Sequence, residues 1–141
     1  MIDSFKGEHA FLSNFYPTKI VVDGIVYRSV EHAYQAAKTT DEKVKRVIRA
    51  KPYASEAKRL GDTVQKREDW DNIKIGVMKE LLDLKFAEGT ELAEQLLSTG
   101  DEELAEGNWW GDTFWGVCKG KGENHLGKLL MDRRKVLKSR Q

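Results

Sequence analysis

Hydrophobic residues recur at intervals of three and four positions along most of the chain, which is the spacing of one helix face. Ser29 and Thr90 precede two of these stretches, where a side-chain oxygen can cap a helix N-terminus. We expect Pro52, Gly61 and Gly89 to end helices, with Gly61 in the C′ position just beyond its helix. The pattern predicts helices over residues 29–40, 41–50, 53–61, 69–87, 90–100 and about 126–137.

The two longest predicted helices have the clearest apolar faces. One stripe should face the core from each of them, with polar residues opposite. The stripe of the helix over 69–87 consists of Trp70, Ile73, Val77, Leu81 and Leu84. The stripe of the final helix consists of Leu126, Leu129, Leu130, Arg133 and Leu137.

Only one stretch of the chain has a strong β signal. Asp23 and Gly24 separate two β-branched runs in TKIVVDGIVYRS, and a tight hairpin turn needs residues that tolerate positive φ. DEELAEG, residues 101–107, is a weaker candidate for a short strand. No alternating βαβ pattern is present, so a Rossmann-type sheet is not expected. The sequence predicts a mostly α-helical α+β fold with at least one short β-hairpin.

Composition limits the class of protein. The 141 residues fit one domain, 1–141, and 24 basic against 23 acidic residues give no general affinity for nucleic acid or membranes. No apolar run approaches the ~20 residues of a membrane span, and the N-terminus lacks the pattern of a signal peptide. We therefore expect a cytoplasmic protein without membrane contact. Cys118 is alone, which excludes an intrachain disulfide and a thiolate zinc site.

Three of the four tryptophans fall in NWWGDTFWG, residues 108–116. A tryptophan cluster most simply fills a core, and for Trp109 and Trp110 that explanation is about as good as a functional one. Glycines in the same stretch favour a loop, where binding residues concentrate. An aromatic wall formed by Trp115 beside the carboxylate of Asp112 suits a planar base attached to a sugar.

A second candidate lies in SVEHAYQAAK. Glu31, Gln35 and Lys38 are spaced to lie on one helix face, where they would form a polar stripe along a cleft. The simpler explanation of Glu31 is electrostatic, because a carboxylate in a first turn is stabilised by the helix dipole. His32 and His125 lack partners at ligand spacing, so we expect them to be structural and expect no metal site.

The segment CKGKGEN is the third candidate. Lys119 and Lys121, with the backbone N–H groups around Gly120 and Gly122, could hold a phosphate before the last helix. A flexible basic turn is an equally good explanation, and the P-loop pattern is absent. A further basic cluster is expected to be solvated helix charge; it comprises Lys58, Arg59, Lys66 and Arg67.

Taken in order, these motifs resemble the YbiA-like or NADAR family. The matching stretches are FLSNFYP, DGIVYRSVEHAYQAAK, REDW, KF, LLSTGDEELAEGN, DTFWG and GKGENHLGKLLMDRR. They run from about Phe5 to Arg134, and their number and order make the resemblance specific. It implies a single-domain YbiA-like fold and an N-glycosidase that cleaves a bond from ribose to a base-like nitrogen. It implies no metal and no cofactor.

The resemblance also implies roles for individual residues. Glu31 matches the main catalytic carboxylate of the S-x-E-H motif, and Asp112 matches the D-x-x-W-G element, where it would bind ribose hydroxyls or assist water. The substrate-binding residues implied by the other motifs are Asn14, Gln35, Lys38, Trp70, Trp115, Gly116, Lys121, Gly122 and Asn124. The pair Trp109-Trp110 is extra aromatic surface that departs from the family pattern.

The sequence is compatible with more than one substrate and with more than one role for Glu31. The expected partner is a phosphorylated ribosyl or ADP-ribosyl compound. ADP-ribosylated guanine in DNA or RNA is favoured slightly over a phosphoribosylated intermediate of riboflavin synthesis. Glu31 could protonate the leaving nitrogen, orient water or stabilise positive charge on the ribose. A module that binds ADP-ribose or a nucleotide without turnover is the rival reading, and a purely structural tryptophan core is a third.

Overall fold

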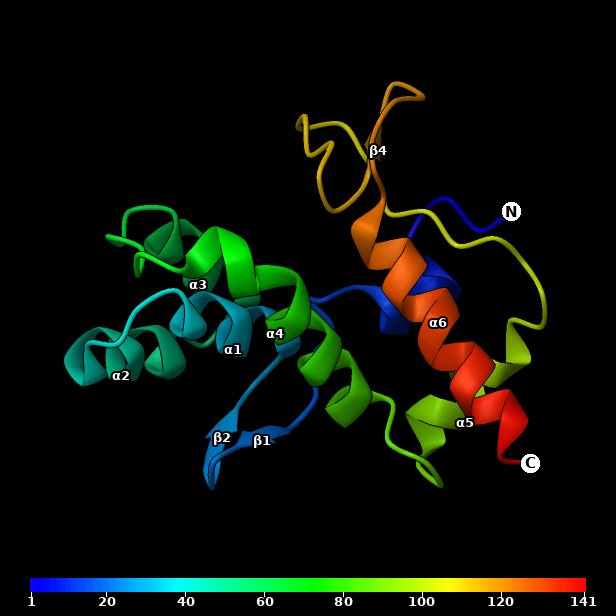
Figure 1. Cartoon of the computed structure of the whole chain (residues 1–141), viewed down its shortest axis with the longest axis horizontal. Coiled ribbons are helices and arrows are strands. Elements are labelled where there is room, and N and C mark those ends of the chain that lie inside the picture. The colour runs from blue at the N-terminus through cyan, green and yellow to red at the C-terminus, as the bar shows by residue number, and fades with distance from the viewer. The chain divides into compact units, whose positions relative to one another are not determined.

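The computed structural model describes all 141 residues and contains six α-helices, one 3-10 helix and four short strands (Figure 1). Two compact units divide the chain, and each is described by itself. One unit is the continuous segment Asn14–Lys85. The other combines Met1–Ser13 with Phe86–Gln141.

The continuous unit begins with the predicted hairpin. Strands β1 (Ile20–Val22) and β2 (Ile25–Tyr27) pair in antiparallel register. Asp23 and Gly24 take positive φ angles of 50° and 79° at the turn, as a type I′ hairpin requires. This part of the prediction is confirmed.

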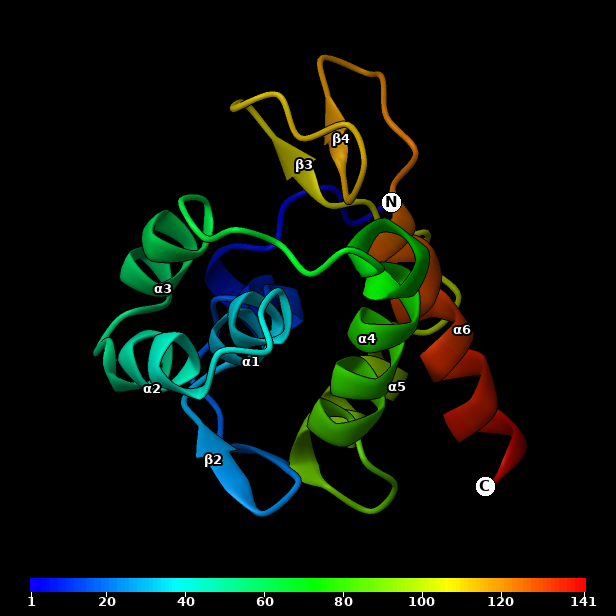
Figure 2. The ribbon, with the colours of Figure 1, turned by 60° about the vertical axis from the view of Figure 1, so that its left-hand side comes forward.

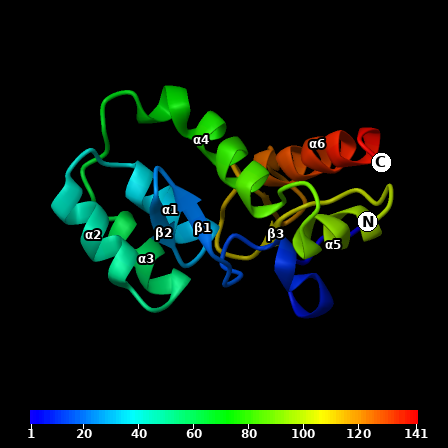
Figure 3. The same cartoon turned by 90° about the horizontal axis from the view of Figure 1, so that it is seen from below.

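Helix α1 (Val30–Ala37) is the centre of this unit. Every residue from Val30 to Ala36 is buried, because α2 (Glu42–Ala50), α3 (Ala54–Gly61), α4 (Trp70–Lys85) and the hairpin all contact it (Figure 3). Ser29 caps the helix as expected, since its Oγ accepts the backbone N–H of His32 at 3.1 Å. The two ring nitrogens of His32 lie 2.7 Å from Ser29 Oγ and 2.8 Å from the Lys51 carbonyl, so this histidine is structural.

Gly61 differs from the prediction. It is the last residue of α3 rather than a C′ residue, and its φ is not positive. A Cβ on Gly61 would collide with the side-chain amide of Gln35. Close approach between α3 and α1 therefore requires glycine here, and backbone conformation does not.

The apolar face of α4 is also shifted from the prediction. Leu84 is 47% exposed, whereas Trp70 and Leu81 are buried as expected. The other buried positions are Met78, Leu82 and Lys85. The buried stripe thus includes positions 78 and 85 where 77 and 84 were predicted, one residue further along the helix.

The second unit contains two elements without a clear sequence signal. Residues Gly7–Leu12 form a 3-10 helix, η1, and β3 (Gly107–Asn108) pairs in parallel with β4 (Val117–Cys118) (Figure 2). Of the candidate strand 101–107, only Leu104 forms a bridge, to Ile2, and Gly107 begins β3. The remaining elements are the helices α5 (Glu91–Ser98) and α6 (His125–Ser139).

Helices α5 and α6 match the prediction more closely. Thr90 caps α5 through the backbone N–H of Ala93 at 3.2 Å, and Gly89 takes a φ of 82° before it. In α6, Leu126, Leu130 and Leu137 are buried as expected. The arginine that is buried is Arg134, not Arg133, and its guanidinium donates to the Thr99 hydroxyl at 2.8 Å and the Glu102 carbonyl at 2.7 Å.

The start of α6 is satisfied by the tryptophan-rich loop. Backbone N–H groups of residues 123–126 donate to carbonyls of residues 113–116 at 2.8–3.3 Å. These donors would otherwise lack partners, because the first four N–H groups of a helix have none within it. The loop is therefore an integral part of the helix terminus.

The observed fold confirms the predicted class, a mostly helical α+β protein with a short antiparallel strand pair. None of its helices is both long enough and apolar enough to span a lipid bilayer.

Asn124 is the position at which this architecture can be tested. Its Nδ2 donates to the Leu104 carbonyl at 2.9 Å, its Oδ1 accepts from the Glu106 N–H at 3.0 Å, and its φ of 54° is left-handed. Because Asn124→Ala removes both hydrogen bonds and disfavours that φ, we expect it to lower the free energy of unfolding by ~2–4 kcal/mol. Urea denaturation measures this, and a loss below ~0.5 kcal/mol would contradict the structural role.

Candidate active site

Glu31 lies in the first turn of α1 with its carboxylate almost removed from water. Its side chain and backbone are 7% exposed, and its backbone N–H donates to the Asn14 carbonyl at 3.0 Å. That bond ties the start of α1 to the segment before the hairpin. Glu31 lies in the first turn as the helix-dipole explanation requires, but that explanation alone does not account for its burial.

Burial dominates the electrostatics of Glu31. Desolvation raises the pKa of its carboxyl above the ordinary value of 4.5, because burial disfavours the charged form. A hydrogen bond from Gln35 and the charges of Lys58 and Lys38 oppose that rise. A raised pKa is typical of a carboxylic acid that donates a proton during catalysis.

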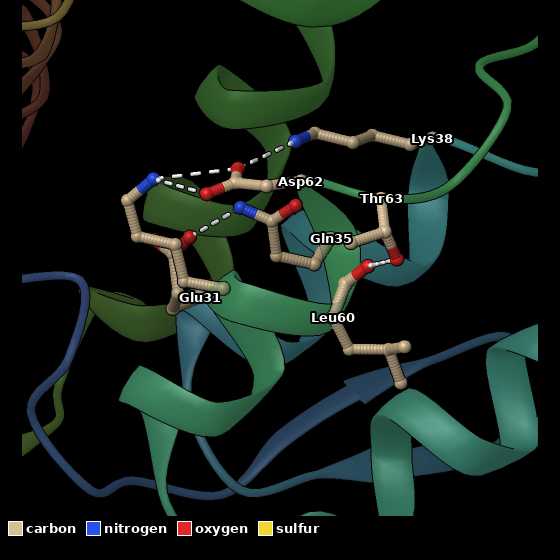
Figure 4. Close-up of polar contacts among 7 residues, drawn as sticks. Glu31, Gln35, Lys38, Leu60, Asp62 and Thr63 are labelled. Atoms are coloured by element: carbon tan, nitrogen blue, oxygen red, sulfur yellow. Dashed lines mark hydrogen bonds and ion pairs between the residues drawn. The ribbon is translucent and has the colours of Figure 1, made fainter.

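Gln35 holds one oxygen of Glu31 in place. Its Nε2 donates to Glu31 Oε2 at 2.6 Å (Figure 4). Its own Oε1 is buried against Gly61 and has no hydrogen-bond partner. The second carboxyl oxygen of Glu31, Oε1, accepts no hydrogen bond within the chain, so it is the oxygen that remains for a proton or a ligand.

Two lysines approach the same region through Asp62. Lys38 Nζ lies 3.9 Å from one oxygen of Asp62 (Figure 4). Lys58 Nζ lies 3.3 Å from the other oxygen. Lys38 is buried, and that burial lowers the pKa of its ammonium group against the opposing charges of Asp62 and Glu31. Asp62 itself is half exposed, so the charges of both lysines are held at the edge of the buried carboxylate.

Trp70 and Asn14 complete this group. The Trp70 ring is buried at the start of α4 and packs on Tyr34 of α1, with ring centroids 5.1 Å apart. Asn14 is buried too; its Nδ2 lies 3.6 Å from Met78 Sδ, and its Oδ1 has no partner. A buried carbonyl oxygen without a partner is costly, which is typical of a position where a ligand supplies the donor.

The structure therefore brings five of the predicted site residues together in the unit Asn14–Lys85. They are Asn14, Glu31, Gln35, Lys38 and Trp70. The other six predicted residues belong to the second unit, and their assignment to the substrate stays a prediction. They are Asp112, Trp115, Gly116, Lys121, Gly122 and Asn124.

Asp112 organises its own loop. Its Oδ1 accepts the backbone N–H groups of Phe114 at 3.1 Å and Trp115 at 2.9 Å. Asn108 closes the loop from the other side, through bonds of 2.8 and 3.0 Å to the Asp112 backbone. Only Oδ2 of Asp112 remains without a bond in the chain.

The glycines of this segment serve close packing. A Cβ on Gly116 would collide with Glu106, and a Cβ on Gly122 would collide with the Gly116 carbonyl. The Trp115 ring packs edge-on against Phe114, with centroids 4.9 Å apart. These contacts give the D-x-x-W-G element a structural role whether or not it also contacts substrate.

The segment predicted to hold a phosphate forms a tight turn. The backbone N–H of Lys121 donates to the Cys118 carbonyl at 3.1 Å, which closes a tight turn. The N–H groups at the start of α6 are taken by the tryptophan-rich loop. The N–H groups of Lys121 and of the start of α6 are thus engaged within the chain, and Lys119 and Lys121 are exposed.

Sequence reasoning missed three neighbours of Glu31. Asp62 was not considered, Lys58 was treated as solvated helix charge, and Gly61 was treated as a helix stop. A further buried cation is Lys85, whose Nζ lies 5.6 Å from the centre of the Tyr16 ring and whose pKa is lowered by burial to about 7. The KF pair of the family pattern was the available signal for Lys85.

An open groove of about 950 Å³ lies near the end of α1, between Thr39, Leu60 and the loop Val64–Asp69. None of the predicted site residues lines it. No group of three or more His, Cys, Asp or Glu side chains is arranged to hold a metal ion.

Comparison with known proteins defines the family. The NADAR domain model matches residues 3–138, so this chain belongs to the NADAR family. The N-glycosidase YbiA of Escherichia coli is 37% identical over 137 residues, covering 95% of this chain and 85% of that protein. An N-glycosidase of Nostoc punctiforme is 41% identical over 133 residues, covering 90% of this chain and 85% of the relative.

A riboflavin biosynthesis protein of Vibrio vulnificus is 45% identical over 127 residues, which cover 87% of this chain and about a third (34%) of that longer protein. The NMR structure of E. coli YbiA superposes with a TM-score of 0.85 at 35% identity, covering 99% of this chain and 88% of that one. The predicted family, the YbiA-like fold and the enzyme class, an N-glycosidase, are confirmed.

The raised pKa of Glu31 predicts a gain in stability for Glu31→Gln. A carboxyl whose folded-state pKa lies above its unfolded value stabilises the fold below pH 4.5, and this contribution is lost as the pH rises through the folded pKa. The amide keeps an acceptor for Gln35 but carries no charge. We expect a higher Tm than wild type at pH 7–8, by about 3–5 °C per kcal/mol gained, and a difference that shrinks toward pH 4.

Differential scanning fluorimetry across this pH range measures the effect. Glu80→Gln is the matched control, because it removes an exposed carboxylate from α4. A Tm difference that does not change with pH, or that equals the control's, would contradict the buried charge.

Gly61 offers a test of how Glu31 is positioned. In Gly61→Ala the new methyl occupies the space of the Gln35 amide, which must leave Glu31 Oε2. We expect a destabilisation of ~1–3 kcal/mol and a shift in the pH dependence of catalysis. Gly76→Ala, on α4 with open space around it, is the control and should leave the pH profile unchanged.

Proposed function

We propose that this chain hydrolyses the N-glycosidic bond between ADP-ribose and a modified guanine base of nucleic acid. The observation that supports the chemistry is the buried carboxyl of Glu31, which desolvation makes a weaker acid than an exposed glutamate, with a pKa above the ordinary 4.5. Breaking a bond between ribose and a base nitrogen needs an acid for the departing nitrogen, and a carboxyl in this environment is suited to that task.

The reaction follows from the bonds of Glu31. The C–N bond lengthens and positive charge grows on the ribose ring, as in other glycosidases. Gln35 fixes Oε2, so the proton on Oε1 passes to the guanine nitrogen as that bond breaks. Water adds its oxygen to the anomeric carbon, and the proton that it releases restores the acid form of Glu31. The products are ADP-ribose and guanine in the strand.

The neighbouring charges suit a substrate with a diphosphate. Lys38 and Lys58 lie on either side of Asp62, and an anionic phosphate can exchange for that carboxylate as their partner. Asn14 Oδ1 has no bond in the chain, and we propose that it accepts a hydrogen bond from a substrate hydroxyl or N–H. These roles require no metal and no cofactor.

A second substrate class is supported by the relatives. The V. vulnificus protein is named for riboflavin biosynthesis. The corresponding candidate is a phosphoribosylated aminopyrimidine, from which the same step would release ribose 5-phosphate. One phosphate would then contact the lysine pair.

Product release from the two substrates, run in parallel and analysed by mass spectrometry, tests the proposal. We expect free ADP-ribose from an oligonucleotide that carries ADP-ribosylated guanine. Glu31→Gln should lower kcat by ~10²–10⁴-fold, the usual contribution of a positioned acid. Glu80→Gln is the matched control and should keep wild-type kcat, because its carboxylate is exposed on α4.

Each other outcome has a definite meaning. Ribose 5-phosphate from the aminopyrimidine substrate, without ADP-ribose release, would select the riboflavin-type substrate. Binding of ADP-ribose without turnover of either substrate would favour a binding module. Full activity in Glu31→Gln would overturn the assignment of Glu31 under either substrate.

A further inference from the structure

Trp109 and Trp110 are the most unusual exposed side chains of this protein. They are 78% and 49% exposed, and the two rings pack edge to face, with centroids 5.7 Å apart and an interplanar angle of 87°. The core-filling explanation of this pair is therefore wrong. Two adjacent exposed indoles need a reason, because burial of a tryptophan is strongly favourable.

The loop that carries the two rings is held firmly in shape. Asn108 and Asp112 close it through two hydrogen bonds of 2.8 and 3.0 Å, and Gly111 supplies the φ of 87° that the turn needs. The hydrogen bonds thus hold the loop of Trp109 and Trp110 in one conformation. Less conformational entropy is then lost when a ligand binds there.

The parallel pairing of β3 and β4 brings lysines to the same place. Asn108 lies opposite Cys118, and both strands run in one direction, so Trp109 and Lys119 leave the pair at the same end (Figure 2). Lys121 is bridged back to Cys118 across the turn. We name this end, with Trp109, Trp110, Lys119 and Lys121, the Trp–Lys edge.

The lysines of the Trp–Lys edge keep their charge available. Both are exposed, and neither forms an ion pair or a side-chain hydrogen bond. The carboxylates of the surrounding segment each have at least one partner other than these lysines. Glu106 binds Asn108 at 3.0 Å, Asp112 Oδ1 binds two backbone N–H groups, and Glu123 lies 3.6 Å from His125 Nε2.

We propose that the Trp–Lys edge binds single-stranded nucleic acid, with bases stacked on Trp109 and Trp110 and backbone phosphates contacted by Lys119 and Lys121. Aromatic rings next to cations are the combination that holds single strands without sequence preference, because every base has a π-face and every nucleotide has a phosphate. An apolar protein partner would gain nothing from the two unpaired lysines, and a duplex hides its base faces in the stack.

The proposal goes beyond hydrolysis, since its ligand is an unmodified strand. It is consistent with a base attached to nucleic acid as substrate but does not require one. Binding and turnover can therefore fail independently of each other.

Fluorescence anisotropy with fluorescein-labelled dT15 and rU15 at low salt tests binding by the whole chain. We expect a measurable Kd for at least one of them, and the stronger ligand distinguishes DNA from RNA. Trp109→Ala with Trp110→Ala should weaken binding about tenfold or more. Trp109→Phe with Trp110→Phe should retain most of it, because phenylalanine also stacks.

The lysine pair is tested through salt. Lys119→Ala with Lys121→Ala should weaken binding and reduce the slope of log K against log salt by about 0.7 per lysine. The matched control removes two exposed lysines of α6, Lys128→Ala with Lys135→Ala, and the aromatic control is the exposed Tyr53→Ala. Both controls should keep the wild-type Kd.

Two results would overturn the proposal. One is that the folded protein, at about 100 μM, binds neither strand. The other is binding that the tryptophan double variant leaves unchanged, or that the control lysine pair reduces as much as Lys119→Ala with Lys121→Ala. Near-UV circular dichroism of each variant confirms that the fold is intact.

Discussion

The removal of one carboxyl group from water governs the structure around α1. An uncompensated buried charge is expensive, so Glu31 either holds a proton or depends on the groups that face it. Those groups explain otherwise unrelated features of the unit Asn14–Lys85. Gln35 is buried in order to donate to Glu31 Oε2, Gly61 leaves space for that amide, and Lys38 and Lys58 meet Asp62 nearby. Stability and chemistry are therefore opposed at this position, as is common at catalytic sites.

The tryptophans fall into two classes with different physical roles. Trp70 and Trp115 are packed against other rings, on Tyr34 and Phe114 respectively, and they help to build the fold. Trp109 and Trp110 pack edge to face against each other and are exposed. A single short motif thus contains one packed tryptophan, Trp115, and an exposed pair, Trp109 and Trp110. The loop achieves this because its carbonyls bond to the start of α6 while Asn108 and Asp112 hold its tip.

Local signals in the sequence predicted local structure well. The Asp23-Gly24 hairpin and the caps Ser29 and Thr90 depend on neighbouring residues, and all three were confirmed. Features that depend on distant residues were missed. The role of Gly61 comes from Gln35, 26 positions earlier in the sequence, and the exposure of Leu84 depends on which side of α4 is covered. The β3–β4 pair is only two residues per strand, too short to produce a periodic pattern.

The central claim is that Glu31 is a buried acid whose affinity for a proton is increased by its surroundings. Its side-chain carboxyl carbon can be followed by NMR as pH is varied, in protein labelled with ¹³C at glutamate, with Glu31→Gln used to assign the signal. We expect a titration midpoint for Glu31 above 4.5. A midpoint at or below 4.5 would show that the carboxylate is stabilised in its charged form, and it would contradict the role of Glu31 as the acid of N-glycoside cleavage.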